Sequence, residues 1–75
     1  NIAKYYYERN MNVAAVERAN YLVKTYPQAP SVKAALALIY HGNMKLGLKE
    51  AANNALSVYQ ATYHAKPDEA ELLTA

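Results

Sequence analysis

Hydrophobic positions recur along this chain at steps of three and four residues, which is the spacing of one face of an α-helix. The clearest example lies in the middle of the chain, where the positions that share a face are Leu36, Ile39, Tyr40, Asn43 and Leu46. A second set, in the following third of the chain, consists of Ala52, Ala55, Leu56 and Tyr59. The composition agrees, because the chain is rich in alanine and leucine, which favour helices. We therefore expect an all-α fold.

Proline, glycine and asparagine divide the chain into four predicted helices and a tail. The helices are expected over residues 2–9, 13–26, 30–46 and 48–64, with a short last helix over 68–73. Asn12 suits the N-cap of the second helix, and Pro30 suits the first turn of the third. Gly47 suits the left-handed position after the third helix. Short connections of this kind make successive helices antiparallel, so we expect helical hairpins.

The chain also repeats itself with an offset of 37 residues. The corresponding pairs are Asn10 and Gly47, Ala15 and Ala52, and Tyr26 and Tyr63. Two-helix units with a period in this range are typical of solenoids, and the tetratricopeptide repeat has a unit of about 34 residues. The first unit resembles that repeat, with an aromatic pair before the turn, small residues after it and a closing proline. We predict a tetratricopeptide-type α-α superhelix of two antiparallel hairpins, residues 1–30 and 31–66, followed by an acidic tail at 67–75.

The size and charge of the chain point to a partner. A chain of 75 residues without cysteine buries a thin core and has no disulfide to support it. It starts at Asn1 rather than methionine, so we expect a C-terminal piece of a longer protein. All eight basic residues precede Pro67, whereas the tail holds Asp68, Glu69 and Glu71 and no base. A basic body suits an acidic partner surface, although it is equally typical of a solvated helix surface.

The sequence shows no arrangement of residues that suggests catalysis, a metal or a cofactor. His41 and His64 lie on different predicted helices, whereas a zinc site needs three or four ligands. The glutamates are dispersed, and neither glycine belongs to a phosphate-binding loop. The longest apolar run, residues 34–40, is far shorter than the ~20 residues that cross a bilayer. We therefore expect no enzyme activity and no cofactor.

Nucleic-acid binding is a weaker alternative. Residues 4–9 interleave basic side chains with three tyrosines, a combination that in principle stacks bases and contacts phosphates. The acidic residues of the chain and its formal net charge of only +2 argue against this alternative, because nucleic-acid-binding domains are usually more basic.

The tyrosines at positions 5–7 point in directions about 100° apart on a helix, so they cannot all be buried. We predict that Tyr6 is buried against the second helix. Tyr7 would then line the concave groove of the superhelix, a face that solenoids typically use for binding. The other expected groove-lining residues, which would equally suit a solvated surface, are Lys4, Glu8, His41, Met44 and Lys45.

The run YYER at residues 6–9, followed by VAAVER at 13–18 and YP at 26–27, resembles the C-terminal repeats of the BamD (ComL) family. Members of this family are outer-membrane assembly lipoproteins of Gram-negative bacteria, and they carry YYxxR, which residues 5–9 match here, then VAAVxR and YP in this order. The resemblance covers about residues 2–67. One departure is Asn10, which stands where a glycine is common in the family.

The resemblance implies a periplasmic scaffold at the outer membrane, anchored by a lipid upstream of this segment. It implies docking on the last POTRA domain of BamA and on accessory lipoproteins of the BAM complex, with no bond made or broken. Arg18 would form a salt bridge to a POTRA carboxylate, supported by Arg9, because arginine is favoured over lysine at protein interfaces. The candidate partner-binding residues are Arg18, Arg9, Tyr7, Met11, Asn12 and Tyr5. The alternative is another tetratricopeptide adaptor of the cell envelope, in pilus assembly or envelope coordination.

Overall fold

The chain is all-helical over residues 2–72, the part that the computed structural model describes, and no strand occurs within that range. The elements are α1 (Ile2–Glu8), α2 (Asn12–Thr25), α3 (Val32–Lys45), α4 (Lys49–Tyr63) and the 3₁₀ helix η1 (Glu69–Leu72). The prediction of an all-α fold is therefore confirmed. The short last helix predicted over 68–73 is present as η1, and Leu73 lies outside the described residues.

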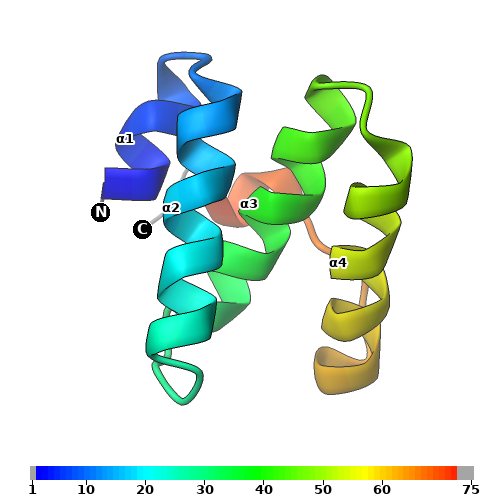
Figure 1. The fold of residues 1–75 in the computed structure, drawn as a ribbon. Coiled ribbons are helices and arrows are strands. Elements are labelled where there is room, and N and C mark those ends of the chain that lie inside the picture. Colours follow the sequence, from blue (N-terminus) through cyan, green and yellow to red (C-terminus); the bar gives the residue numbers. More distant parts are fainter. Residues whose placement is uncertain (1, 73–75) are drawn as a thin grey trace.

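The four α-helices form two antiparallel hairpins, α1 with α2 and α3 with α4 (Figure 1). Helix α3 lies between α2 and α4, and the two helices contact it to a similar extent. After α4 the chain turns back, and η1 lies against α3 behind the plane of the hairpins in Figure 1. This arrangement is the one expected of tetratricopeptide-type hairpins, with a C-terminal segment added on one face.

Both hairpin turns depend on a residue with left-handed backbone conformation. Gly47 has φ +76°, as the sequence predicted, and Asn10 has φ +62° at the corresponding position of the first hairpin. Glycine adopts this conformation without steric cost, and asparagine tolerates it better than most other residues do. The predicted offset of 37 residues therefore relates two turns of the same backbone shape.

The hydrogen bonds of the two turns also correspond. Met11 N–H donates to the Tyr6 carbonyl and Leu48 N–H donates to the Asn43 carbonyl, each at 2.9 Å. A bond to the carbonyl five residues earlier, next to a left-handed residue, defines the Schellman motif that closes a helix. Each turn thus satisfies carbonyl groups that would otherwise be left unpaired at a helix end.

The starts of α2 and α3 differ from the prediction. Met11, with φ −91° and ψ 69°, is the non-helical residue before α2, and Asn12 is already helical and makes no cap hydrogen bond. The reason is that the Schellman turn brings the chain into helical register one residue earlier than the N-cap prediction assumed. Pro30 likewise lies before α3 rather than in its first turn, because the helix begins at Val32 after Ser31.

Helix α3 is the centre of the core. Eight of its 14 residues are buried, so the helix is enclosed on more than the one face that the sequence predicted. Leu36 and Ile39 on the predicted face are buried, but Ala37 and Leu38 are also only 0% and 3% exposed. The cause is that α2, α4 and η1 all pack against α3, and a helix covered on several sides needs apolar residues around its circumference.

The crossing of α2 and α3 requires the glycine at position 42. A Cβ atom added there would lie 2.6 Å from Cγ2 of Val16, which is closer than side-chain atoms approach one another in proteins. Val16 is 8% exposed, and its branched side chain has one preferred rotamer in a helix, so it has little room to move away. Gly42 is therefore a contact residue of the α2–α3 interface.

We predict that Gly42→Ala destabilises the protein by about 1 kcal/mol, with an upper limit of about 2 kcal/mol. Alanine gains about 1 kcal/mol of helix propensity over glycine, but the overpacking against Val16 costs about 1–3 kcal/mol. Urea unfolding followed by circular dichroism measures the difference. In the control, Val16→Ala should reduce the penalty of Gly42→Ala, because it removes the clashing methyl group. A Gly42→Ala protein that is as stable as the parent would contradict the close approach.

We predict that Gly47→Ala destabilises the protein by about 1–2 kcal/mol, although no atom lies within 4 Å of the new Cβ. The cost is that of forcing a residue with a side chain into the left-handed region. Gly47→Asn should cost less, because Asn10 adopts the same conformation in the first hairpin. Thermal unfolding of both variants gives the comparison, and equal losses would argue against a backbone origin.

Candidate functional site

The face that the sequence predicted to be a groove is occupied by residues 67–72 of the chain itself. Helix α4 ends at Tyr63, the next residue His64 reverses the chain with a left-handed φ of +55°, and Pro67 follows shortly after. Residues 67–72, called the tail segment from here on, then run back along α3 towards α1 (Figure 1). The groove is therefore a site with an occupant, and the occupant is acidic.

Two apolar residues anchor the tail segment. Leu72 is 3% exposed and belongs to the same core cluster as residues of α1 and α3, and Pro67 is also buried. Between α3 and the tail segment, Nε2 of His41 lies 3.3 Å from the Pro67 carbonyl oxygen. The tail segment is thus fixed near both of its ends.

A carboxylate at the centre of the tail segment meets two polar groups, one from α1 and one from α3. The Tyr7 hydroxyl donates a hydrogen bond of 2.6 Å to Oε2 of Glu69, and Nζ of Lys45 lies 3.9 Å from the same oxygen. Nζ of Lys45 also lies 4.2 Å from the centre of the Tyr7 ring, within the range of a cation–π contact. Tyr7, Lys45 and Glu69 therefore form one compact cluster.

The cluster favours the ionised form of Glu69. The hydrogen bond from Tyr7 is the main reason that the pKa of Glu69 lies below its usual value, and the charges of Lys45 and His41 add to it. Partial desolvation and the neighbouring Asp68 act in the opposite direction. Burial, followed by the hydrogen bond to Glu69, raises the pKa of the Tyr7 hydroxyl, so this group stays a donor throughout the physiological range.

The prediction of which tyrosine is buried was wrong. Tyr7 is only 4% exposed, whereas Tyr6 is half-buried and Tyr5 is 50% exposed. Tyr7 follows Ala3 by four residues, so the two share the buried face of α1 and both belong to the core. Tyr7 does face the predicted groove, but the tail segment covers it there.

The other predicted groove residues differ in their surroundings. His41 and Lys45 contact the tail segment. Lys4 is half-buried on α1, while Glu8 and Met44 are exposed. The structure thus brings Tyr7, His41 and Lys45 together around the tail segment.

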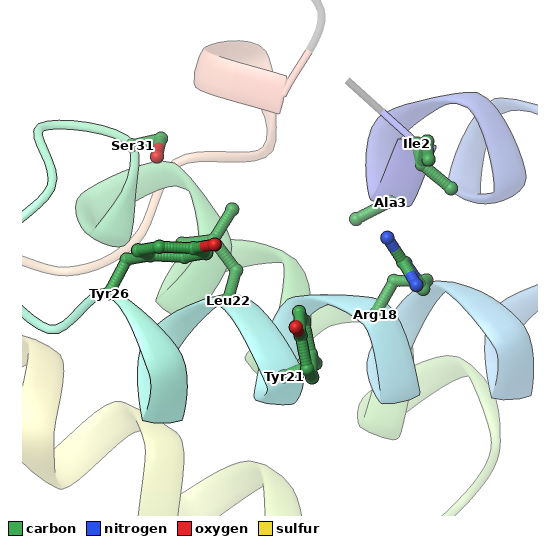
Figure 2. A pocket seen from close by; sticks show the side chains of 7 residues that line it. All are labelled: Ile2, Ala3, Arg18, Tyr21, Leu22, Tyr26 and Ser31. Carbon is green, nitrogen blue, oxygen red and sulfur yellow. The ribbon is translucent and has the colours of Figure 1, made fainter.

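Arg18 lies at a separate surface. Its guanidinium group points from the middle of α2 towards Ala3 of α1, and its Cζ lies 5.4 Å from the centre of the Tyr21 ring (Figure 2). It forms one wall of an open hollow with a volume of about 310 Å³. The residues that line this hollow are Ile2, Ala3, Arg18, Tyr21, Leu22, Tyr26 and Ser31. Exposed tyrosines beside an arginine are typical of protein contact surfaces.

The remaining predicted partner-binding residues lie on the first hairpin. Arg9 packs on Tyr5, with Cζ 3.6 Å from the ring centre and Nη1 donating to the Tyr5 carbonyl at 3.2 Å. Met11 is 48% exposed at the turn, and Asn12 next to it is half-buried. Both line a second shallow hollow that extends to Leu46. These residues are therefore not gathered in one place with Arg18.

The described residues carry neither a candidate metal site nor a membrane span. Residues 2–72 bring no three histidine or acidic side chains together in a way that could hold a metal ion. In the same range, every helix is too short or too polar to cross a bilayer.

Sequence reasoning missed Pro67, Glu69 and Leu72, which carry the contact of the tail segment. A signal was present, because an aliphatic residue followed the acidic residues instead of further polar ones. On the sequence alone, the basic residues before Pro67 suggest an acidic external partner. In the structure, the acidic residue that pairs with Lys45 is Glu69 of the tail segment itself.

We predict that the tail segment is held less firmly as the pH falls. Because the folded-state pKa of Glu69 is lowered, its contribution is present above the usual glutamate pKa and is lost as the pH falls through the lowered value. Tyr7→Phe removes the hydrogen bond and should raise the pKa of Glu69 towards its usual value. Side-chain ¹³C shifts of Glu69 measured against pH report this. Tyr6→Phe is the matched control, and an equal effect of the two variants would contradict the assigned contact.

The sequence resembles known outer membrane proteins over most of its length. Residues 1–58 match the family described as YfiO, outer membrane lipoprotein. The chain is 43% identical over 60 residues to the "Outer membrane protein assembly factor BamD" of Xylella fastidiosa strain Temecula1 / ATCC 700964. It is 42% identical over 60 residues to the protein of the same name from strain 9a5c.

The region aligned with the two relatives covers most of this chain but only a small part of each relative. In both comparisons it is 80% of this chain but only 20% of the relative, so the chain spans about a fifth of the length of these proteins. No solved structure matches the chain. Because the family match takes in α1, α2, α3 and most of α4, the chain belongs to the YfiO/BamD family of outer membrane lipoproteins.

Proposed function

We propose that this chain is a protein-binding part of an outer membrane protein assembly factor and acts at the periplasmic face of the outer membrane. The observation that carries the proposal is the family match over residues 1–58, together with the names of the two relatives. Its role is to hold other proteins in place rather than to make or break bonds. Attachment to the membrane would come from a lipid group of the whole protein, in keeping with the description of the family as lipoproteins.

The fold supports a scaffold. We propose that residues 1–30 and 31–66 are consecutive repeats, because their turns have the same conformation and hydrogen bonds. Repeats of this kind stack into solenoids whose extended surfaces bind other polypeptides. The structure offers two such surfaces, the hollow beside Arg18 and the groove that holds the tail segment.

We propose that the Arg18 surface docks on the last POTRA domain of BamA, and that accessory lipoproteins of the BAM complex bind the neighbouring surfaces. Arg18 is exposed on α2, and its planar guanidinium suits a carboxylate of the partner. The apolar wall formed by Ile2, Tyr21 and Tyr26, each more than half exposed, would be buried with it. Arg18 would supply orientation and the tyrosines would supply contact area.

The other residues proposed for partner binding lie on α1, at the first turn or at the start of α2, outside the Arg18 hollow. They are Arg9, Tyr5, Tyr7, Met11 and Asn12. The stacked pair of Arg9 and Tyr5 presents a cation on an aromatic ring, which also suits an acidic partner. Tyr7 would take part only when the tail segment is displaced, because Glu69 and Lys45 cover it.

We predict that Arg18→Glu weakens binding to the purified POTRA domain by about 2 kcal/mol or more, which is roughly a 30-fold rise in Kd. The reason is that the variant places a negative charge opposite the partner's carboxylate. Isothermal titration calorimetry gives the two affinities.

Lys49→Glu is the matched control for this measurement. It makes the same change of charge at an exposed position at the start of α4, away from the Arg18 hollow. Circular dichroism should show that both variants keep the helical content of the parent. If Arg18→Glu and Lys49→Glu bind the POTRA domain as tightly as the parent does, Arg18 is not part of the interface.

A further inference from the structure

We propose that the groove between α1 and α3 is a binding site for an acidic peptide segment of a partner protein, and that the tail segment occupies it as an internal competitor. The peptide would carry a glutamate followed three residues later by a bulky aliphatic residue, as Glu69 and Leu72 do here. The inference concerns a different surface from the Arg18 hollow and does not rest on POTRA binding.

The polar part of the groove selects a carboxylate. Tyr7 donates at 2.6 Å, Lys45 contributes a positive charge at 3.9 Å, and both act on the same oxygen of Glu69. The donor and the cation belong to α1 and α3, so they are positioned by the helical core and not by the tail segment. A glutamate of another peptide bound at this position would contact the same two groups.

The apolar part of the groove selects an aliphatic side chain at a fixed distance. Leu72 lies at the end of the single 3₁₀ turn that starts at Glu69, and it is 3% exposed. One turn of a 3₁₀ helix places residues i and i+3 on the same side, so the carboxylate and the leucine face the groove together. A partner would need both groups at this spacing.

The ion pair between Lys45 and Glu69 is made at the surface and does little to keep the tail segment from exchanging. The side chains of Lys45 and Glu69 are 41% and 50% exposed, and solvent-exposed ion pairs contribute little net stability. Residues 64–66, which join the tail segment to α4, are all exposed. A single 3₁₀ turn is not stable on its own, so the tail segment is held only by its contacts with α1 and α3 and can leave the groove without unfolding the four α-helices.

The tail segment competes because it is tethered. A short linker gives an attached segment an effective concentration on the order of millimolar. A free peptide with the same contacts therefore binds with an affinity reduced by the fraction of molecules in which the groove is open. Weakening the attached segment should raise the affinity for the free one, and this is the signature of competition at one site.

The test is a titration of the full chain with a fluorescein-labelled peptide of residues 66–75, KPDEAELLTA, followed by fluorescence anisotropy. Leu72→Ala in the protein, which weakens the attached segment, should bind the peptide at least tenfold more tightly than the parent does. Adding Lys45→Glu to this variant should reverse the gain. A labelled peptide with glutamine in place of the first glutamate, the one equivalent to Glu69, should also bind at least tenfold more weakly.

Two further variants make the outcome decisive. Glu69→Gln in the protein keeps Leu72 in place and should also increase the affinity for the peptide. It replaces Leu72→Ala in the test if circular dichroism shows that Leu72→Ala is unfolded. Glu50→Gln on α4 is the matched control and should behave as the parent does. Equal peptide affinity in the parent, Leu72→Ala and Glu69→Gln would overturn the proposal, as would a gain that Lys45→Glu leaves unchanged. Because the titration contains no POTRA domain, its failure leaves the proposed function standing.

Discussion

The burial of α3 on several sides is the constraint on which the rest of this structure depends. Four elements, α1, α2, α4 and η1, pack against this one helix, and eight of its 14 residues are buried. Such packing requires small residues where neighbours approach closely, and Ala37 and Gly42 meet this need. With 75 residues the chain has one thin core, so each side of α3 that is covered matters to its stability.

The same constraint shapes the candidate groove. Lys45 follows His41 by about one turn of α3, and both side chains contact the tail segment. They are carried by a helix whose other sides are locked into the core, and Tyr7 is held by the contact of α1 with α3. Groups on rigid elements lose little freedom when they bind, so the backbone positions of these residues need little ordering to hold a carboxylate.

The turns and hairpins could be predicted from the sequence, because left-handed turn positions depend on local chemistry. Asn10 and Gly47 marked both turns, and their offset of 37 residues revealed the repeat. The phase of α1 was harder, since periodicity alone does not say which of three consecutive tyrosines faces inward. Ile2 and Tyr6 form as good a pair by spacing as Ala3 and Tyr7.

The sequence does not predict where the tail segment binds, because a run of acidic residues after a proline has the composition of a solvated segment, and the aliphatic Leu72 hints at burial without indicating a partner. Glu69 contacts Tyr7 and Lys45 only because the fold brings α1, α3 and the tail segment together. A similar limit applies to Arg18, whose sequence motif indicated a partner but not the tyrosine-walled hollow beside it.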